Sequence, residues 1–276
     1  MKVLLDQAAV RHPAARATAA AALGPLSLAF EPGEQVAVIG PSGAGKTTLL
    51  HTLACALRPA SGRVFLDSVD PWSVRASALR QLRGELFLAP QVPPLPPRQR
   101  VITAVAAGRL PRMGLLASVR SLLVPTGVAE AHAALAHFDL ADKLFERVDR
   151  LSGGERQRVG LARGLVANAR LLLVDEPLSA LDPARAAQAL QSLTQAARDR
   201  GATLVCTLHD VPMALQHFPR VIGLRDGVLQ FDAQPQDVDA ERLRALYHGH
   251  IDELQARTPV ALPLPEAAVP GVVHCR

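Results

Sequence analysis

Residues 40–47 constrain this chain more than any other segment. They read Gly-Pro-Ser-Gly-Ala-Gly-Lys-Thr, which fits the pattern G-x-x-x-x-G-K-[ST], and they lie between an apolar run (Gln35–Ile39) and a helical pattern (Gly45–Leu57). Glycines let backbone N–H groups curl around an oxyanion, and the helix start directs its unpaired N–H groups at the same anion. We therefore expect Lys46 to reach the β- and γ-phosphates and the Thr47 hydroxyl to ligate Mg²⁺. By itself the loop predicts nucleotide binding and no particular reaction.

Two carboxylates, Asp175 and Glu176, follow the apolar run Leu171–Val174. Ligands of parallel α/β sheets bind at the carboxyl ends of the strands. We therefore expect Asp175 to hold Mg²⁺, through water, and Glu176 to polarise the water that attacks the γ-phosphate. Taken alone, these residues also fit an acidic turn that caps the next helix.

A second glycine-rich helix start, Leu-Ser-Gly-Gly-Glu-Arg-Gln-Arg, occupies residues 151–158. Ser152 and the amides of Gly153 and Gly154 form a second predicted anion site on the same chain. Ser152 and Glu155 also fit the capping box Ser-x-x-Glu, and both interpretations can hold at once.

This peptide resembles the signature of ATP-binding-cassette (ABC) ATPases, and the resemblance covers roughly residues 1–232. It implies that Gln91 is the glutamine that touches Mg²⁺ and water and connects to a permease. It also implies that Ser179–Asp182 is the D-loop and that His209 is the switch histidine that contacts the γ-phosphate. The implied catalytic residues are Glu176, His209, Gln91 and Lys46; the nucleotide-binding residues are Gly40, Pro41, Ser42, Gly43, Ala44, Gly45, Lys46, Thr47, Thr48, His12, Ser152, Gly153, Gly154, Glu155 and Asp182; the Mg²⁺ ligands are Thr47, Gln91 and Asp175.

The adenine contact departs from the family pattern. Members of the family usually carry an aromatic residue upstream of the phosphate loop, whereas this chain has Arg11-His12-Pro13. His12 is the best candidate for stacking on adenine, although an alanine-rich stretch separates it from the first core strand.

Short apolar runs alternate with helical patterns, which predicts an α/β domain with a mainly parallel sheet. Arg225–Val228 carries an Asp-Gly hairpin signal. The family resemblance adds an antiparallel β subdomain and an α-helical subdomain inserted at about 90–165 in an ATPase domain of 1–235. Residues 236–276 are expected to form a Pro-rich, flexible C-terminal extension. The predicted strands are Gln35–Ile39, Arg63–Leu66, Glu85–Leu88, Leu171–Val174, Thr203–Thr207, Val221–Leu224 and Val228–Phe231, and the predicted helices are Gly45–Leu57, Glu155–Ala167, Pro183–Arg200 and Val211–His217.

Composition excludes several classes of protein. The net charge is +5, but the basic residues are scattered and only 3% of residues are aromatic, so we expect no nucleic-acid partner. Three widely spaced cysteines (Cys55, Cys206 and Cys275) favour neither a disulfide framework nor a structural zinc site. No apolar run reaches the ~18–20 residues of a membrane span and the start shows no leader pattern, so we expect a soluble intracellular chain.

The family resemblance also implies partners. ATP and Mg²⁺ are the expected cofactors, and each ATP is expected to lie between the phosphate loop of one subunit and Ser152–Glu155 of the other in a head-to-tail homodimer. Transmembrane permease subunits and, indirectly, a periplasmic solute-binding protein complete the assembly. The expected location is the cytoplasmic face of a bacterial inner membrane.

Four longer stretches resemble the ATPase subunits of phosphonate or phosphite importers. They are Gly108–Pro111, Asp142–Phe145, Arg147–Arg150 and Phe218–Gly227. The alternatives are the motor of an ABC exporter or extractor, an importer of another solute, and an ABC ATPase outside transport. The last class usually shows tandem cassettes, coiled-coil arms or zinc-binding cysteine pairs, which this sequence lacks.

Overall fold

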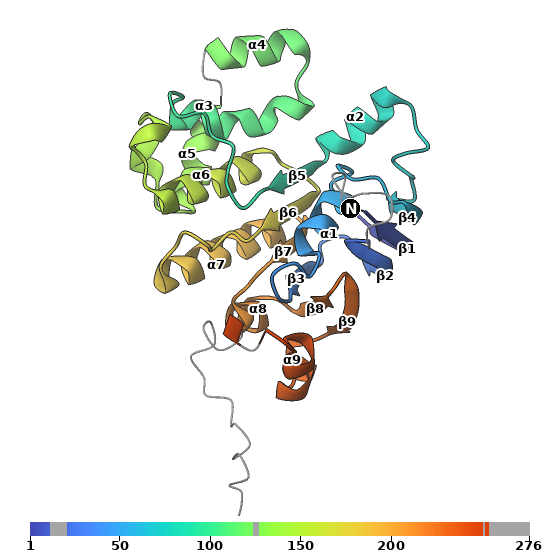
Figure 1. Cartoon of the computed structure of the whole chain (residues 1–276). Coiled ribbons are helices and arrows are strands. Elements are labelled where there is room, and N and C mark those ends of the chain that lie inside the picture. Colours follow the sequence, from blue (N-terminus) through green and yellow to red (C-terminus); the bar gives the residue numbers. More distant parts are fainter. Residues whose placement is uncertain (12–20, 124–126, 251, 254–276) are drawn as a thin grey trace, which may run out of the picture.

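The computed structural model describes residues 1–11, 21–123, 127–250 and 252–253. Within them a six-stranded sheet has the order β5-β6-β7-β3-β8-β9, with parallel pairing from β5 to β8 and an antiparallel edge at β9. A three-stranded antiparallel sheet, β2-β1-β4, packs beside it (Figure 1). The strands are β1 (Val3–Val10), β2 (Leu23–Phe30), β3 (Gln35–Ile39), β4 (Ser61–Leu66), β5 (Leu86–Ala89), β6 (Leu171–Asp175), β7 (Thr203–Thr207), β8 (Arg220–Arg225) and β9 (Val228–Ala233).

Helices cover the main sheet and form a separate lobe between β5 and β6 in sequence (Figure 1). Short 3-10 helices join the helices of this lobe. The helices are α1 (Lys46–Leu53), α2 (Ala76–Gly84), α3 (Val101–Ala106), α4 (Leu115–Leu123), α5 (Val128–Ala136), α6 (Gly153–Val166), α7 (Pro183–Asp199), α8 (Val211–His217) and α9 (Ala240–Leu246), and the 3-10 helices are η1 (Ala107–Arg112), η2 (Ala141–Lys143), η3 (Val148–Arg150) and η4 (Pro235–Asp237).

Alternate residues of the parallel strands face two different cores. Along β3, Val36 and Val38 pack with α1 and the three-stranded sheet, whereas Ala37 and Ile39 pack with the helices of the other face. Strands buried on both faces appear as continuous apolar runs in the sequence, and β3 and β7 have the predicted bounds for that reason. The predicted fold class is confirmed.

The Asp-Gly signal forms the predicted hairpin. Asp226 and Gly227 have φ values of 52° and 73°, and β8 and β9 pair antiparallel on either side of them. Left-handed conformations at both central positions match the right-handed twist of a hairpin.

The part of the chain that packs in the core extends further toward the C-terminus than the sequence pattern indicates. Leu243, Leu246 and Tyr247 are buried in the core and α9 contacts β8, so α9 is an integral part of the domain. The boundary near residue 235 and the flexibility of the extension remain predictions, and residues 254–276 lie outside the described part of the chain.

Two further observations concern the membrane and the cysteines. None of the helices in the described part of the chain combines the length and the apolarity needed to cross a bilayer. Cys55 and Cys206 are free and buried, and burial raises the pKa of the Cys55 thiol to about 12.

Candidate functional site

The phosphate loop lines a cavity of about 370 Å³ at the carboxyl edge of the parallel strands, a size suited to a cofactor or small ligand. Gln91, Glu176 and His209 lie on the same cavity although they are far apart in sequence. The sequence predicted these three residues and the loop together, and the fold brings them together. The remaining lining residues are Ala22, Ser42, Gly43, Ala44, Gly45, Lys46, Thr47 and Thr48.

Two glycines give the loop its shape. Gly40 has a φ of 150°, and a Cβ atom there would lie 2.0 Å from the carbonyl oxygen of Leu224 in β8. Gly45 precedes α1 with a φ of 96°, and a Cβ atom there would lie 2.7 Å from the carbonyl oxygen of Ala22. The first turn of α1 has neither a side-chain cap nor an acidic residue. Its N-terminal N–H groups are therefore positioned to bind an anion.

Lys46 is buried at the base of the loop. Its Nζ donates to the carbonyl oxygens of Gly40 at 2.7 Å and Pro41 at 3.0 Å. A compact ammonium makes these two bonds in a chain whose other basic residues are nearly all arginine, which indicates that the position requires a small point charge.

Asp175 and Thr47 form the candidate Mg²⁺ site. The Thr47 hydroxyl donates to Oδ2 of the buried Asp175 at 2.9 Å, and the Thr207 hydroxyl donates to Oδ1 at 2.6 Å. Mg²⁺ is held by one or two carboxylates, hydroxyls and substrate phosphates, so this oxygen donor set at the mouth of the phosphate loop fits the ion. Thr207 pairs with Asp175 in the β6–β7 ladder, which fixes the carboxylate.

Glu176 lies at the centre of a polar cluster. Gln91 Nε2 donates to its Oε2 at 2.8 Å, and its Oε1 pairs with His209 Nε2. Its backbone φ is 46°, the left-handed region that non-glycine residues rarely adopt, and its N–H donates to the Thr207 hydroxyl at 3.0 Å. Strained backbone of this kind is concentrated at functional sites, where neighbouring contacts maintain it.

The signature residues lie at the start of α6. Ser152 and Glu155 make the predicted capping box, since the Ser152 N–H donates to Glu155 Oε2 at 2.7 Å and the Glu155 N–H donates to Ser152 Oγ at 3.2 Å. A Cβ atom on Gly154 would lie 2.8 Å from the Ala180 carbonyl oxygen, so this start packs closely on the D-loop. Asp182 caps α7 by accepting the Arg185 N–H at 3.1 Å. Neither the signature nor Asp182 lines the cavity around the phosphate loop.

Three residues at the candidate site were not predicted from the sequence. Thr207 holds both acidic residues, Ala22 lines the cavity, and the Glu253 carboxylate accepts the Ser42 N–H at 3.0 Å and the Ser42 hydroxyl at 3.3 Å. Only Thr207 had a signal, because it ends an apolar strand next to the one that carries the carboxylates. His12, the predicted adenine platform, lies outside the described residues.

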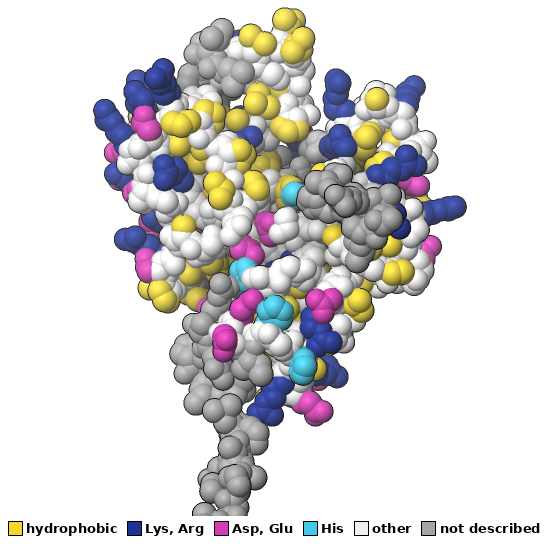
Figure 2. All heavy atoms as spheres, viewed as in Figure 1, with side chains coloured by type: hydrophobic (Ala, Val, Ile, Leu, Met, Phe, Trp, Pro, Cys, Tyr) yellow, Lys and Arg dark blue, Asp and Glu magenta, His cyan; other side chains and the backbone are white. Residues whose placement is uncertain are grey.

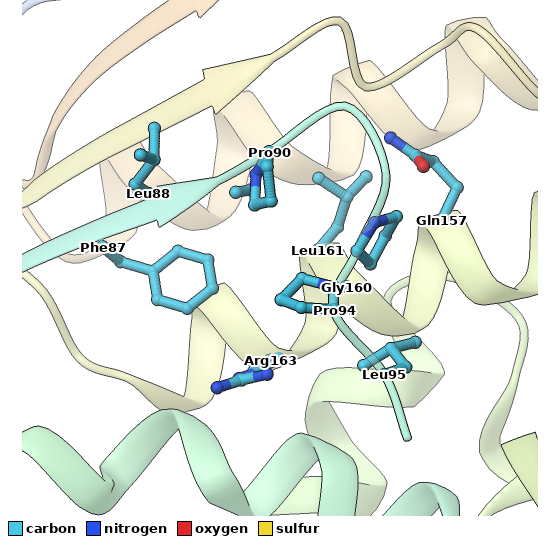
Figure 3. A pocket seen from close by; sticks show the side chains of 11 residues that line it. Phe87, Leu88, Pro90, Pro94, Leu95, Gln157, Gly160, Leu161 and Arg163 are labelled. Carbon is cyan, nitrogen blue, oxygen red and sulfur yellow. The ribbon is translucent and has the colours of Figure 1, made fainter. Parts of the chain in front are cut away.

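A small groove of about 70 Å³ lies beside Gln91, between β5 and α6 (Figure 3). Phe87, Pro94 and Leu95 line it from β5 and the loop that follows, and Arg163 and Gly160 line it from α6. A Cβ atom on Gly160 would lie 2.7 Å from Pro93, so a larger residue there would push the loop away from α6.

The chain is similar to several known proteins. A family model described as "ABC transporter" matches residues 23–179. The chain is 66% identical to the "Phosphonates import ATP-binding protein PhnC" of Polaromonas sp. and 60% identical to "Phosphonates import ATP-binding protein PhnC 2" of Albidiferax ferrireducens, each over 100% of both chains. It is also similar to the solved dimeric structure of the ATP-binding cassette MJ0796 bound to ADP and Pi, with a TM-score of 0.73 and 27% identity over 86% of this chain and 100% of that chain.

Proposed function

The chain belongs to the ABC transporter family as an ATP-binding subunit, and from this premise we propose that it hydrolyses ATP to drive import of phosphonates. The observation that carries the substrate class is the identity of 60% and 66%, over full length, to two phosphonate import proteins. The four sequence stretches that resemble such subunits support the same assignment.

The arrangement of the cavity supports ATP hydrolysis. The loop amides and Lys46 bind the phosphates, and Thr47, Asp175 and Gln91 would hold Mg²⁺, which neutralises charge on the β- and γ-phosphates when bound. Glu176 polarises the water that attacks the γ-phosphorus, and the bond to the β-phosphate oxygen breaks to give ADP and phosphate. His209 and Gln91 orient the Glu176 carboxylate, because each contacts one of its oxygens.

We propose a head-to-tail homodimer as the active form. The signature residues lie outside the cavity that holds the phosphate loop, so the second anion site of this chain serves a different nucleotide. A partner chain bound in the reverse direction supplies that nucleotide, and the dimeric state of the similar MJ0796 cassette supports the arrangement.

The groove beside Gln91 is the proposed contact with the permease, which would place the chain at the cytoplasmic face of the inner membrane. The loop that carries Gln91 forms one wall, and α6, which begins at the signature, forms the other. A permease segment in this groove therefore touches both elements that contact ATP, so closure of the dimer moves the segment.

Reconstitution tests the proposal. The chain is combined in proteoliposomes with the permease and the solute-binding protein encoded beside it, and uptake of labelled methylphosphonate is measured with ATP inside. We expect uptake that phosphite or another phosphonate competes with and that Glu176→Gln abolishes. ATP hydrolysis without methylphosphonate uptake would refute the substrate class and leave the motor intact. Uptake of a different solute would identify another importer, and outward transport would identify an exporter.

A further inference from the structure

Helix α4 exposes three apolar side chains and turns a serine inward. Leu115, Leu116 and Val119 are 80%, 87% and 51% exposed, whereas Ser121 is only 7% exposed and Ser118 is half-buried. Both serine hydroxyls bond to local backbone, Ser118 to the Gly114 carbonyl at 3.0 Å and Ser121 to the Ser118 carbonyl at 2.8 Å. A helix on the surface of a globular domain shows the opposite orientation.

The exposed face is a contiguous surface. Leu115 and Val119 lie one turn apart on the same side, and Leu116 extends that side. Leu116 and Leu115 are the two most exposed large hydrophobic residues among those described. Figure 2 shows hydrophobic side chains at this end of the molecule, and Figure 1 places α9 at the opposite end. Contiguous exposed apolar surface of this kind marks an interaction site.

The segment of sequence that contains α4 is basic, and of its arginines Arg109 pairs with Glu130 at 3.9 Å. No Asp or Glu occurs between Glu85 and Glu130, and the interval contains five arginines. Removing these five from the 30 basic residues leaves 25, the number of acidic residues, so this interval accounts for the whole net charge of +5. Arg120, on the last turn of α4, and Arg112, shortly before the helix, are exposed, and Arg112 also donates through Nη1 to the Asn168 carbonyl at 2.9 Å. The five are Arg98, Arg100, Arg109, Arg112 and Arg120.

An apolar helix face beside arginines is the pattern of a helix that lies in the surface of an anionic bilayer. We propose that α4 binds the anionic lipid surface directly, with Leu115, Leu116 and Val119 between the headgroups and Arg112 and Arg120 at the lipid phosphates. The α4 residues line neither the nucleotide cavity nor the groove beside Gln91, so lipid contact leaves both accessible. The inference relies on the proposed function for its setting at a membrane, and its test needs neither ATP nor a permease.

Vesicle sedimentation tests this contact. The purified full chain is mixed with vesicles of phosphatidylglycerol and phosphatidylethanolamine, or with vesicles of phosphatidylcholine alone. We expect binding to the anionic vesicles that salt weakens, and little binding to phosphatidylcholine. Leu115→Ser with Leu116→Ser should lower the partition coefficient roughly tenfold or more, and Arg120→Gln should lower it about fivefold.

Phe145→Ser is the matched control, because Phe145 is 60% exposed and lies outside α4. It should bind vesicles like the wild type, and all variants should hydrolyse ATP at the wild-type rate, which shows that they fold. Equal binding of the wild type and the double Ser variant, or no binding to anionic vesicles, would overturn the proposal. Loss of permease binding in detergent by the double Ser variant, with no vesicle binding by the wild type, would assign α4 to a protein partner instead. A transporter that fails to take up methylphosphonate leaves the vesicle result unchanged, so the two proposals fail separately.

Discussion

The glycine-rich starts of α1 and α6 differ in the hydrogen bonds that their first residues make. α1 follows Gly45 with a φ of 96° and has no side-chain cap and no acidic residue in its first turn. α6 follows Ser152, whose N–H and hydroxyl both bond to Glu155. The start of α1 (the open start) therefore offers its N–H groups to a phosphate. At the start of α6 (the closed start), a carboxylate of the same chain already accepts the Ser152 N–H, and the Ser152 hydroxyl accepts the Glu155 N–H.

This difference predicts the order of the binding steps in the proposed dimer. We expect ATP to bind first at the open start of α1, where Lys46 adds a positive charge. The closed start of α6 is expected to contact a phosphate only after a partner chain has bound the nucleotide. ATP binding by one chain and capture by the other are thus separable steps, and variants should affect one without the other.

Glu176→Gln has the largest expected effect. It tests whether the start of α1 in one chain and the start of α6 in its partner contact the same nucleotide. Removal of the carboxylate base should lower ATP hydrolysis about 10²- to 10⁴-fold, while ATP binding persists. Dimers should then accumulate with ATP, as measured by size-exclusion chromatography with light scattering. Glu241→Gln, in the first turn of α9, is the control and should hydrolyse ATP normally. Normal turnover in the Glu176 variant would remove Glu176 from the role of base.

Lys46→Ala tests the open start. Loss of the ammonium should weaken ATP binding about a hundredfold, because hydrogen bonds to charged groups are worth about 1.5–3 kcal/mol. Lys46→Arg should also fail, since the larger guanidinium does not fit between the Gly40 and Pro41 carbonyls and the phosphates. Fluorescent nucleotide titration gives the affinities, and a thermal melt shows whether each variant folds. Full affinity in Lys46→Arg would show that only charge matters at this position.

Ser152→Ala tests the closed start. Hydrolysis should fall about tenfold, which corresponds to loss of one hydrogen bond of about 1.4 kcal/mol to a phosphate, whereas ATP affinity of the isolated chain should not change. The lost helix cap should also destabilise the fold by about 1 kcal/mol.

The matched control for this cap is Asp239→Ala, because Asp239 caps α9 by accepting the Arg242 N–H at 2.8 Å. Asp239→Ala should lower the melting temperature about as much as Ser152→Ala does and should leave ATP hydrolysis unchanged. Equal loss of hydrolysis in both variants would mean that Ser152 acts only on stability.

Glu253→Gln tests whether the Ser42 donors in the phosphate loop are free to bind a phosphate. The Glu253 carboxylate accepts the N–H and hydroxyl of Ser42, which lines the nucleotide cavity, so it competes with a phosphate for the same donors. Its removal should lower the KM for ATP about two- to fivefold, the effect of a partly exposed charge worth about 0.5–1 kcal/mol. Glu241→Gln again serves as the control, and an unchanged or higher KM would exclude competition.

The sequence predicted the fold and the site best where pattern and structure are local. β3 and β7 have the predicted bounds because strands buried on both faces are continuous apolar runs. β1 and β2 were not predicted as individual strands, since a half-exposed antiparallel sheet with a bulge lacks that pattern. Thr207 could be placed at the end of its strand from the sequence, but its contact with Asp175 depends on the pairing of two strands that are distant in sequence.

The sequence also could not predict which side of a surface helix faces solvent. The α4 sequence specifies an apolar side and a polar side, but only packing against α3 determines which side faces solvent. The arginines of this region likewise appear scattered in the sequence. Their significance depends on the missing carboxylates between Glu85 and Glu130 and on the outward face of the helix beside them.

Glu155→Gln has the smallest expected effect and tests the carboxylate that closes α6. The Ser152 N–H, which donates to this carboxylate, holds the pKa of Glu155 below its ordinary value. A folded-state pKa below the unfolded one means that the stabilisation is complete above the unfolded pKa of about 4.3 and is lost as the pH falls through the folded pKa. Between about pH 6 and about pH 3, the melting temperature of the wild type should therefore fall by about one degree more than that of the variant.

Gln retains an oxygen that accepts the Ser152 N–H, so the geometry of the cap persists and only the titration of the side chain disappears. If the two proteins lose stability in parallel, the carboxylate charge does not stabilise α6, and the closed start depends on hydrogen bonding alone.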